Sequence, residues 1–343
     1  MEPGTFTKQE IQTQPEAWAD ALDQVESNQT ELQNIIQKND YDNVLFAGCG
    51  STYYLSLAAA ALFQETTGRQ ARAIPSGELL LNPPTILSEG KTLLIAVSRS
   101  GSTTETVKAV EMFKKQNRGT VIAITNYGEE PLAGLADIPI VIPKGQEQSV
   151  AQTRSFASMY VASTALTMLA AGRSDLIKSM HNLPEVGEKI MSRYDHLSST
   201  IGENLNIDRF YFLGSGARYG LACEVNLKMK EMTLTHSEPF HFLEFRHGPM
   251  SMVKESAVVV GMVSEKNTVH EEKVLSEMLA KGASIVSLGE TGCTAEFASG
   301  IPENVRGVLY LPVLQWMAYY RSIAKGLNPD KPENLTAVVS LVF

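Results

Sequence analysis

Short apolar runs alternate with amphipathic segments along most of the chain. In the first half, runs with the length of buried strands cover 43–48, 92–97, 120–125 and 138–142, and 71–76 is a candidate for a further short strand. Apolar residues recur at helical spacing over 53–65, 106–115 and 155–171. Strands that alternate with helices predict an α/β fold, in which a parallel sheet carries helices on both faces.

The same order of elements recurs in the second half of the chain. The apolar runs of this half cover 210–213, 257–263, 283–288 and 307–311, and the closing helix covers 313–324. The offset stays near 166 residues through all of these elements, with 307–311 corresponding to the strand at 138–142. The sequence therefore predicts two three-layer αβα domains of one plan, related by duplication.

The boundaries of these domains follow from the polar stretches between them. Two helices over 10–14 and 18–36 suggest a helical arm or lid at 1–38, ahead of a first domain at 39–173. A polar helical linker is predicted at 174–205, a second domain at 206–329 and a tail at 330–343. A length of 343 residues agrees with two domains, because it exceeds what one core usually holds.

Composition narrows the class of partner. The net charge is −9 and the pI is near 5.3, so neither nucleic acid nor an anionic membrane surface is expected to bind. No apolar run reaches the length of a membrane span, and the polar N-terminus carries no signal-peptide pattern. Three widely spaced cysteines indicate a reducing compartment, and we expect a cytoplasmic protein.

The hydroxyl-rich turn after the strand at 92–97 is the strongest candidate site. Gly101 lies among five hydroxyl side chains, those of Ser98, Ser100, Ser102, Thr103 and Thr104. A turn of this kind ahead of a helix presents backbone N–H groups and a helix dipole to an anion. The alternative is ordinary helix capping, but capping does not need so many hydroxyls. We predict an anion site here, most simply for a phosphate.

A second glycine turn follows the first strand. Gly48 and Gly50 alone are a weak sign of dinucleotide binding, since the third glycine is absent and no acidic residue ends the next strand. No cofactor is therefore predicted. The histidines at 181, 196, 236, 241 and 270 show no metal-ligand spacing, so no metal is predicted either.

Candidate catalytic groups lie in the second half. Lys228 and Glu231 are three residues apart on a helix predicted over 220–234, and they share one face. A solvated salt bridge is the alternative for this pair. His247 lies in a rigid turn and is either structural or an acid/base partner of the carboxylate. Glu265 makes the second-half counterpart of the hydroxyl turn a poor phosphate cradle, so one half is expected to hold the anion and the other to supply chemistry.

Several motifs carry a family resemblance. They are Cys49-Gly50-Ser51-Thr52, Ser98-Arg99-Ser100-Gly101-Ser102-Thr103, Glu147 through Val150-Ala151-Gln152-Thr153-Arg154, Lys228-Met229-Lys230-Glu231, Glu244-x-x-His247-Gly248-Pro249 and Lys331-Pro332-x-Asn334-Leu335. From about residue 42 onward the chain resembles proteins with two tandem sugar isomerase (SIS) domains. It is similar to the isomerase half of glucosamine-6-phosphate synthase and to stand-alone phosphosugar isomerases, deaminases and deglycases.

The resemblance implies a role for each motif. Residues expected to bind the phosphate and sugar hydroxyls are Ser51, Thr52, Ser98, Arg99, Ser100, Ser102 and Thr103, while Val150 and Gln152 correspond to sugar-contacting positions. Arg99 stands where the synthase pattern has Gln. Glu231 corresponds to the base that moves a proton between C1 and C2, and Lys228 to its neighbour. His247 corresponds to the residue that opens the sugar ring, which comes from the partner subunit and implies a homodimer.

Two departures from the synthase pattern shape the expected reaction. No glutaminase domain or N-terminal Cys nucleophile precedes the isomerase half, so glutamine-dependent amination by this chain alone is not expected. Ala337 stands where the synthase carries a Schiff-base Lys. The leading hypothesis is a deaminase/isomerase that converts glucosamine 6-phosphate to fructose 6-phosphate and ammonia. The alternatives are a fructosamine-6-phosphate deglycase, an aldose–ketose phosphosugar isomerase, and a sugar-phosphate sensor without catalysis.

Overall fold

The chain folds into two compact units. A computed structural model describes residues 2–38 and 41–336. The N-terminal unit comprises Thr13–Glu147 and Gln152–Pro184, and the C-terminal unit comprises Gln148–Ala151, Glu185–Leu335 and the segment that ends at Gln12. The division near Pro184 falls inside the predicted linker, which is helical as expected; the predicted domain limits themselves stay predictions.

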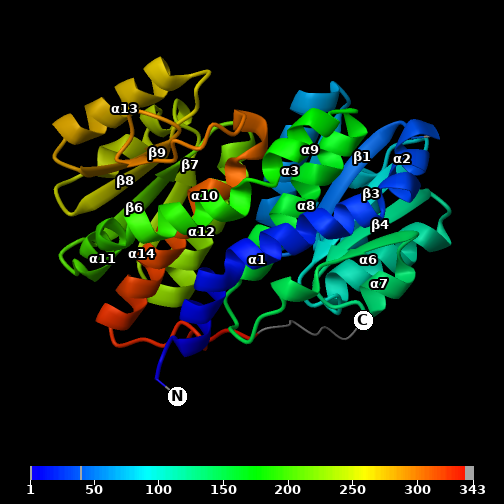
Figure 1. Cartoon of the computed structure of the whole chain (residues 1–343), viewed down its shortest axis with the longest axis horizontal. Helices are drawn as coiled ribbons and strands as arrows, with labels where there is room; N and C mark the ends of the chain where they lie inside the picture. The colour runs from blue at the N-terminus through cyan, green and yellow to red at the C-terminus, as the bar shows by residue number, and fades with distance from the viewer. Residues whose placement is uncertain (1, 39–40, 337–343) are drawn as a thin grey trace. The chain divides into compact units, whose positions relative to one another are not determined.

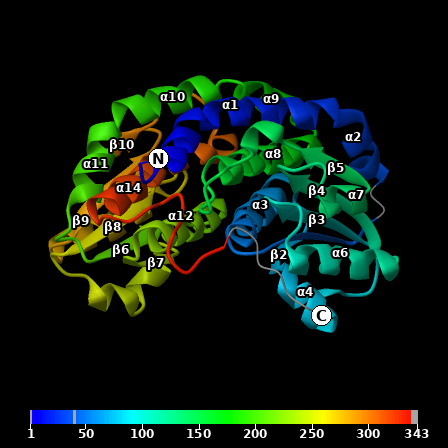
Figure 2. The ribbon, with the colours of Figure 1, turned by 90° about the horizontal axis from the view of Figure 1, so that it is seen from below.

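The N-terminal unit is built on a five-stranded parallel sheet. Its strands, in spatial order, are β2 (Ala71–Pro75), β1 (Asn43–Gly48), β3 (Thr92–Ser98), β4 (Gly119–Thr125) and β5 (Ile138–Val141). Helices α3 (Ser51–Thr67) and α8 (Arg154–Ala170) cover one face, and α4 (Ser76–Leu81), α6 (Thr104–Lys115) and α7 (Pro131–Leu135) cover the other (Figure 2). The remaining helices include α1 (Thr5–Ser27), which begins in the C-terminal unit, α2 (Gln29–Lys38), α5 (Pro83–Ile86) and α9 (Ser174–Met180).

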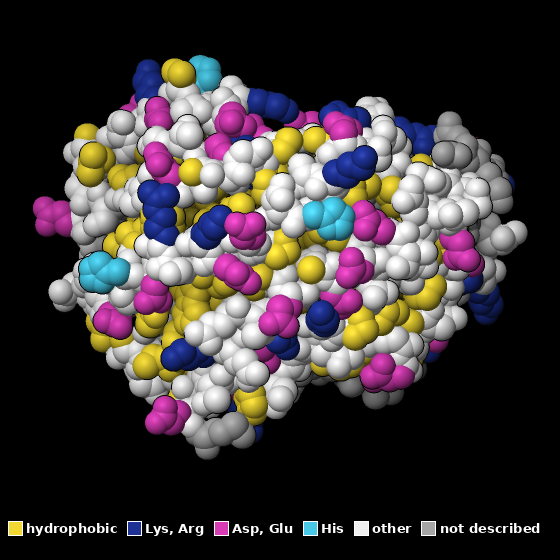
Figure 3. Space-filling view, viewed as in Figure 1, with side chains coloured by type: hydrophobic (Ala, Val, Ile, Leu, Met, Phe, Trp, Pro, Cys, Tyr) yellow, Lys and Arg dark blue, Asp and Glu magenta, His cyan; other side chains and the backbone are white. Residues whose placement is uncertain are grey.

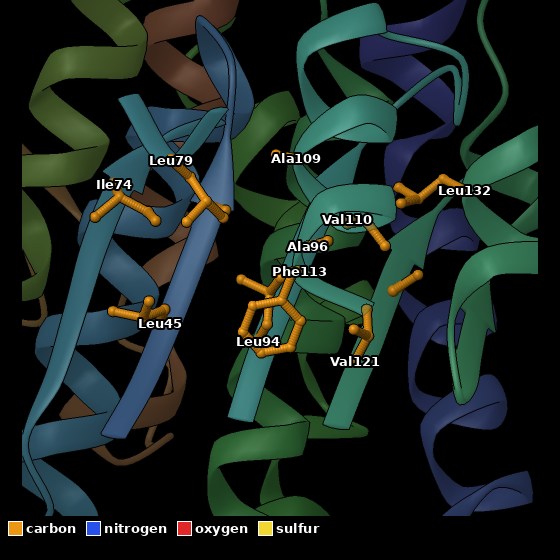
Figure 4. Close-up of a cluster of buried hydrophobic side chains, with 12 residues drawn as sticks. Leu45, Ile74, Leu79, Leu94, Ala96, Ala109, Val110, Phe113, Val121 and Leu132 are labelled. Atoms are coloured by element: carbon orange, nitrogen blue, oxygen red, sulfur yellow. The ribbon is translucent and has the colours of Figure 1, made fainter. Parts of the chain in front are cut away.

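The strands of this sheet are apolar on both faces because helices cover both faces. Leu45 and Leu94 point to the side of α6, where they pack with Phe113 in a fully buried cluster (Figure 4). Phe46, the next residue along β1, points to the opposite face and lies edge-on to Phe63 of α3, with 5.9 Å between ring centroids. Successive side chains of a strand point to opposite faces, and both faces are buried here. The strands therefore appear as continuous apolar runs in the sequence.

The C-terminal unit repeats this plan. Its parallel strands, in spatial order, are β10 (Ala295–Glu296), β9 (Ser284–Gly289), β8 (Ala257–Met262), β6 (Arg209–Leu213) and β7 (His236–Phe240). Helix α12 (Ala217–Thr233) packs on β6 and β7, α14 (Leu311–Ala324) packs on α12, and α11 (Asp195–Glu203) packs on α14. Helix α13 (Thr268–Ala280) packs on β8 and β9, and α10 (Leu183–Arg193) precedes α11 (Figure 1).

Local geometry confirms the predicted duplication. Read from the other edge, the second sheet has the strand order of the first. Gly50 and Gly216 precede equivalent helices with nearly identical backbone angles, φ 55 and ψ −122 against φ 60 and ψ −134. These positive φ values favour glycine. The first strand of each unit also pairs with the central strand of its sheet: Ala47 pairs with Ala96 in the first sheet, and Leu213 pairs with Gly261 in the second.

Some sequence predictions are wrong or incomplete. Residues 307–311 form no strand: Gly307–Tyr310 is a 3-10 helix that leads into α14, and β10 takes the fifth place in the sheet. Helix α1 continues through Pro15 and ends at Ser27, so the break between the first two helices comes later than expected. Its Trp18 and Leu22 side chains are fully buried; the predicted arm or lid at 1–38 stays a prediction. Helix α13 was not anticipated.

No membrane-spanning helix lies among the described residues, and one face of the molecule mixes both signs of charge. Among residues 2–38 and 41–336, no helix combines the length and apolar character needed to cross a bilayer. On the face drawn in Figure 3, lysine and arginine side chains are scattered among aspartate and glutamate side chains. This pattern agrees with the net charge of −9.

Candidate functional site

The strand order creates one special edge in the N-terminal unit. The chain leaves β1 toward β2 on one side and returns to β3 on the other, so the carboxyl ends of β1 and β3 form a topological switch point. Open α/β sheets bind their ligands at such points. The loops at 49–52 and 98–103 both begin there, and Cys49 Sγ lies 3.6 Å from Thr106 Oγ1 in the helix that follows the second loop.

The first loop is a tight glycine turn that buries its own hydroxyls. A Cβ on Gly48 would lie 2.5 Å from the Thr52 backbone, so only glycine fits there. Thr52 Oγ1 accepts a hydrogen bond from Cys49 N at 2.8 Å and donates one to Cys49 O at 2.9 Å. Ser51 and Thr52 are both nearly fully buried. Thr52 therefore holds the turn in shape at the edge of the site.

The second loop gathers hydroxyl groups around Gly101. Ser98 Oγ and Ser100 Oγ lie 3.2 and 3.4 Å from Thr103 Oγ1. The same two serine oxygens accept hydrogen bonds from Gly101 N and Ser102 N, each at 3.2 Å. Gly101 has φ 67, and a Cβ on it would lie 2.8 Å from Glu130 Cβ. The predicted site residues Ser98, Ser100 and Thr103 are thus one hydroxyl cluster at the start of α6, with half-buried Ser102 in the same loop.

Arg99 lies in the same loop beside a buried carboxylate. Its side chain is 8% exposed, and Nη1 lies 3.7 Å from Oε2 of Glu147, whose side chain is fully buried. The Arg99 carbonyl accepts hydrogen bonds from Asn126 N at 3.2 Å and from Thr125 Oγ1 at 3.3 Å. These contacts join the loop after β3 to the loop after β4 and to the segment before α8.

The segment before α8 carries the two predicted sugar-contacting residues. Ser155 Oγ donates a 3.5 Å hydrogen bond to Oε1 of half-buried Gln152, which belongs to the N-terminal unit. Val150 belongs to the C-terminal unit, where its backbone N–H donates to Asp330 O at 3.0 Å.

The C-terminal unit holds the predicted catalytic pair. On α12, Lys228 Nζ lies 2.5 Å from Glu231 Oε2 and 3.5 Å from Glu224 Oε1. The side chains of Lys228 and Glu224 are 2% exposed, whereas that of Glu231 is 20% exposed. The pair is therefore not a solvated surface salt bridge. One ammonium is shared by two carboxylates, and of these Glu231 is the one that solvent or a ligand can reach.

His247 and Lys325 have different surroundings. The exposed His247 follows a short 3-10 turn, and its backbone N–H donates to Glu244 O at 2.9 Å. Lys325 Nζ donates to Thr233 O at 2.5 Å, so Lys325 ties the end of α14 to the end of α12.

The switch point of the second sheet is filled by the protein's own charged groups. Glu271 Oε2 accepts from Ser264 N at 2.6 Å and from Ser264 Oγ at 3.1 Å. Arg218 occupies the place of Thr52, and it contacts Glu271 Oε1 at 3.1 Å and Glu303 Oε1 at 2.6 Å. A buried carboxylate thus takes the donors that an anionic ligand would use. That the N-terminal half alone holds an anion stays a prediction.

The described part of the chain holds no cluster of side chains suited to a metal ion. Within residues 2–38 and 41–336, no three histidine, cysteine or acidic side chains are grouped to hold a metal ion. Burial raises the pKa of the Cys49 thiol, which therefore stays protonated beside the glycine turn. Ala337 lies outside the described residues. The prediction of no cofactor stays a prediction.

Sequence reasoning missed Glu224 and Glu271, and it quoted Glu147 in a motif without giving it a role. Glu224 could have been found, because it is four residues before Lys228 on the same helix face. The ion pairs of Glu147 with Arg99 and of Glu271 with Arg218 join distant segments.

The family model for the SIS domain matches residues 37–169 and 205–293, in both halves of the chain. The chain belongs to the SIS domain family. The duplicated sheets described above are its two SIS domains, which confirms both the resemblance and the predicted fold class.

Curated relatives of this SIS protein include two archaeal enzymes. It is 29% identical over 351 residues to the isomerizing glutamine–fructose-6-phosphate aminotransferase of Pyrococcus horikoshii, covering 98% of this chain and 58% of that protein. It is 28% identical over 340 residues to the enzyme of the same name from Sulfurisphaera tokodaii, covering 98% and 56%. The chain thus spans less than two thirds of either relative.

Solved structures match the SIS protein over nearly its whole length. Glucosamine-6-phosphate deaminase from Thermotoga maritima is 29% identical with a TM-score of 0.79, covering 94% of this chain and 100% of that one. Tagatose-6-phosphate ketose/aldose isomerase from Escherichia coli has a TM-score of 0.86 at 23% identity, covering 96% and 98%. The second likeness supports the fold alone.

Proposed function

We propose that this SIS protein is an aminosugar-phosphate deaminase/isomerase that converts glucosamine 6-phosphate and water to fructose 6-phosphate and ammonia. The observation that carries the proposal is the hydroxyl cluster of Ser98, Ser100 and Thr103 at the switch point of the first sheet. Such a cluster at a helix start suits a phosphate group. The similarity to the Thermotoga maritima deaminase supports the choice of an aminosugar.

The proposed chemistry is a proton shift next to a carbonyl. In the open-chain sugar, Glu231 takes the proton from C2 and returns a proton to C1. A second proton passes from the nitrogen on C2 to O1, so the aldehyde and amine become an alcohol and an imine. Water then adds to the imine at C2 and ammonia leaves. Lys228 holds the Glu231 carboxylate through the 2.5 Å contact, and the phosphate anchor fixes the sugar's position. One water molecule is consumed for each ammonia released, which balances the reaction.

We further propose that the active form is a homodimer in which His247 opens the sugar ring bound by the partner. The support is that His247 is exposed in the single chain, on a segment that also exposes Leu243 (52%) and Met252 (56%). Exposed apolar side chains near a candidate catalytic group suit a subunit contact. A cytoplasmic location belongs to the same proposal.

The test follows ammonia and fructose 6-phosphate together after glucosamine 6-phosphate is added to the purified protein. We expect both products in equal amounts from the wild type. Glu231→Gln should lower kcat about 10²–10⁴-fold with little change in phosphate binding. Lys230→Gln, a change at an exposed position on the same helix, is the matched control.

Other outcomes would redirect the proposal. Release of a bulkier amine from a phosphorylated fructosamine, with no ammonia from glucosamine 6-phosphate, would favour a deglycase. Interconversion of an aldose and a ketose phosphate would favour a plain isomerase. Binding of sugar phosphates without any turnover would favour a sensor.

A further inference from the structure

Glu147 is a fully buried carboxylate that the proposed reaction does not use. Its Oε1 accepts hydrogen bonds from Thr153 N at 2.8 Å, Thr153 Oγ1 at 3.0 Å and Ser155 N at 3.0 Å. Its Oε2 accepts one from Ser155 Oγ. These donors lie at the start of α8, where Thr153 makes no side-chain cap of its own. Glu147 therefore caps α8 from outside the helix.

The same carboxylate also faces the hydroxyl loop. Arg99 Nη1 lies 3.7 Å from Glu147 Oε2, and both side chains are withdrawn from solvent. Screening by water is weak for such a pair, so each charge strongly reduces the field of the other. The Arg99 backbone is part of the loop that carries Ser98 and Ser100. The field at the candidate phosphate site therefore depends on the pair, and Arg99 alone does not set it.

Further contacts keep this pair at a fixed place. Gln146 Nε2 donates to Asn126 O at 3.0 Å, and Asn126 N donates to Arg99 O at 3.2 Å. Tyr127 Oη donates to Glu147 O at 3.2 Å. The loops after β3 and β4 and the segment before α8 are thus connected at both the backbone and the side chains.

We propose that Glu147 is a positioning residue that holds Arg99 beside the hydroxyl loop and offsets its charge, and so sets how tightly the site binds phosphate. The inference rests on the proposed phosphate site and extends it. A site without the negative charge of Glu147 would hold a phosphate dianion more strongly. Because Glu147 offsets the charge of Arg99, the site binds phosphate with moderate affinity, which allows a phosphorylated product to leave.

The test measures the affinity of inorganic phosphate by calorimetry at constant ionic strength, in a double-mutant cycle. Glu147→Gln should bind phosphate at least threefold more tightly than the wild type, and this gain should disappear when Arg99→Gln is added. A purely structural cap would give weaker binding, because its loss would disorder the loop. Ser155→Ala is the matched control, since it removes one donor to Glu147 and keeps both charges.

Each result decides the inference. The inference is overturned if a folded Glu147→Gln variant binds phosphate as tightly as the wild type or more weakly. It is also overturned if the gain in affinity persists when Arg99→Gln is added, or if the wild type binds no phosphate. If Glu147→Gln does not fold, Arg99→Gln alone should weaken phosphate binding at least tenfold, and unchanged affinity overturns the inference. Because no turnover is measured, the proposed reaction can fail while this pattern holds.

Discussion

Lys228 Nζ lies 2.5 Å from Glu231 Oε2, and of these two side chains only that of Glu231 is partly exposed. The ammonium is thus an internal counter-ion, and the carboxylate is the part of the pair that a substrate can meet. Helix α12 supplies both groups at a spacing of three residues, so their geometry is set by the helix and not by a loop.

Replacement of Lys228 by Met should destabilise the protein. The change leaves the carboxylates of Glu224 and Glu231 without their shared cation, and breaking a buried ion pair from one side costs about 3–5 kcal/mol. Urea unfolding measures the free energy of unfolding. Lys230→Met, at an exposed position on the same helix, should change it by less than about 0.5 kcal/mol. Equal effects of the two variants would contradict burial of the pair.

Glu271→Ala should open the second switch point and expose its donors. Loss of the carboxylate leaves the guanidinium of Arg218 with Glu303 alone, and we expect unfolding to become easier by about 3 kcal/mol. Sulfate should restore stability more than sodium chloride of the same ionic strength, because a sulfate ion can accept from Arg218 and Ser264. Thermal unfolding in the two salts checks this. The same response to both salts would mean that no anion site is created.

Phe113→Ala should be among the most costly changes in the first sheet's core. Phe113 is fully buried among Leu45, Leu94 and Val121 (Figure 4), and removal of a buried ring costs about 3–5 kcal/mol. Leu81→Ala, at a position that is 66% exposed, serves as the control and should cost less than about 0.5 kcal/mol. Chemical unfolding of both variants tests the difference, and a small effect of Phe113→Ala would show that the core refills the cavity.

The three thiols should react slowly in the native protein. Burial raises the pKa of Cys223 to about 11, and it also raises the pKa values of Cys49 and Cys293. Since the thiolate is the reacting form, alkylation at pH 8 should be slow and should accelerate as the pH rises toward 11. Mass spectrometry after a timed iodoacetamide pulse measures this, with denatured protein as the reference. Rapid native labelling of Cys223 at pH 7 would contradict its burial.

The sequence predicted much of the fold because parallel strands buried on both faces produce apolar runs. Runs such as 92–97 were therefore assigned as strands, and the duplication supplied their order. The run at 307–311 was assigned wrongly because a short buried run does not distinguish a strand from a helical turn.

The candidate site was predictable only where its contacts are local. The hydroxyl cluster lies within six consecutive residues, and Lys228 and Glu231 share one helical turn. Glu147 and Arg99 are far apart in the chain, as are Arg218 and Glu271, and their charges meet only because parallel strands bring successive loops to one edge. No spacing rule in one sequence reveals such pairs.

The hydrogen bonds of Asp330 have a consequence for the order of folding. Its carboxylate accepts from Thr7 N and Thr7 Oγ1, both at 2.8 Å, so the C-terminal unit needs a segment near the start of the chain. During synthesis, the segments 13–147 and 152–184 of the N-terminal unit are made before the second sheet. Residues 2–12 must wait until residue 330 has left the ribosome. Residues 2–12 are thus made before the second sheet but are fixed in place only after it is complete.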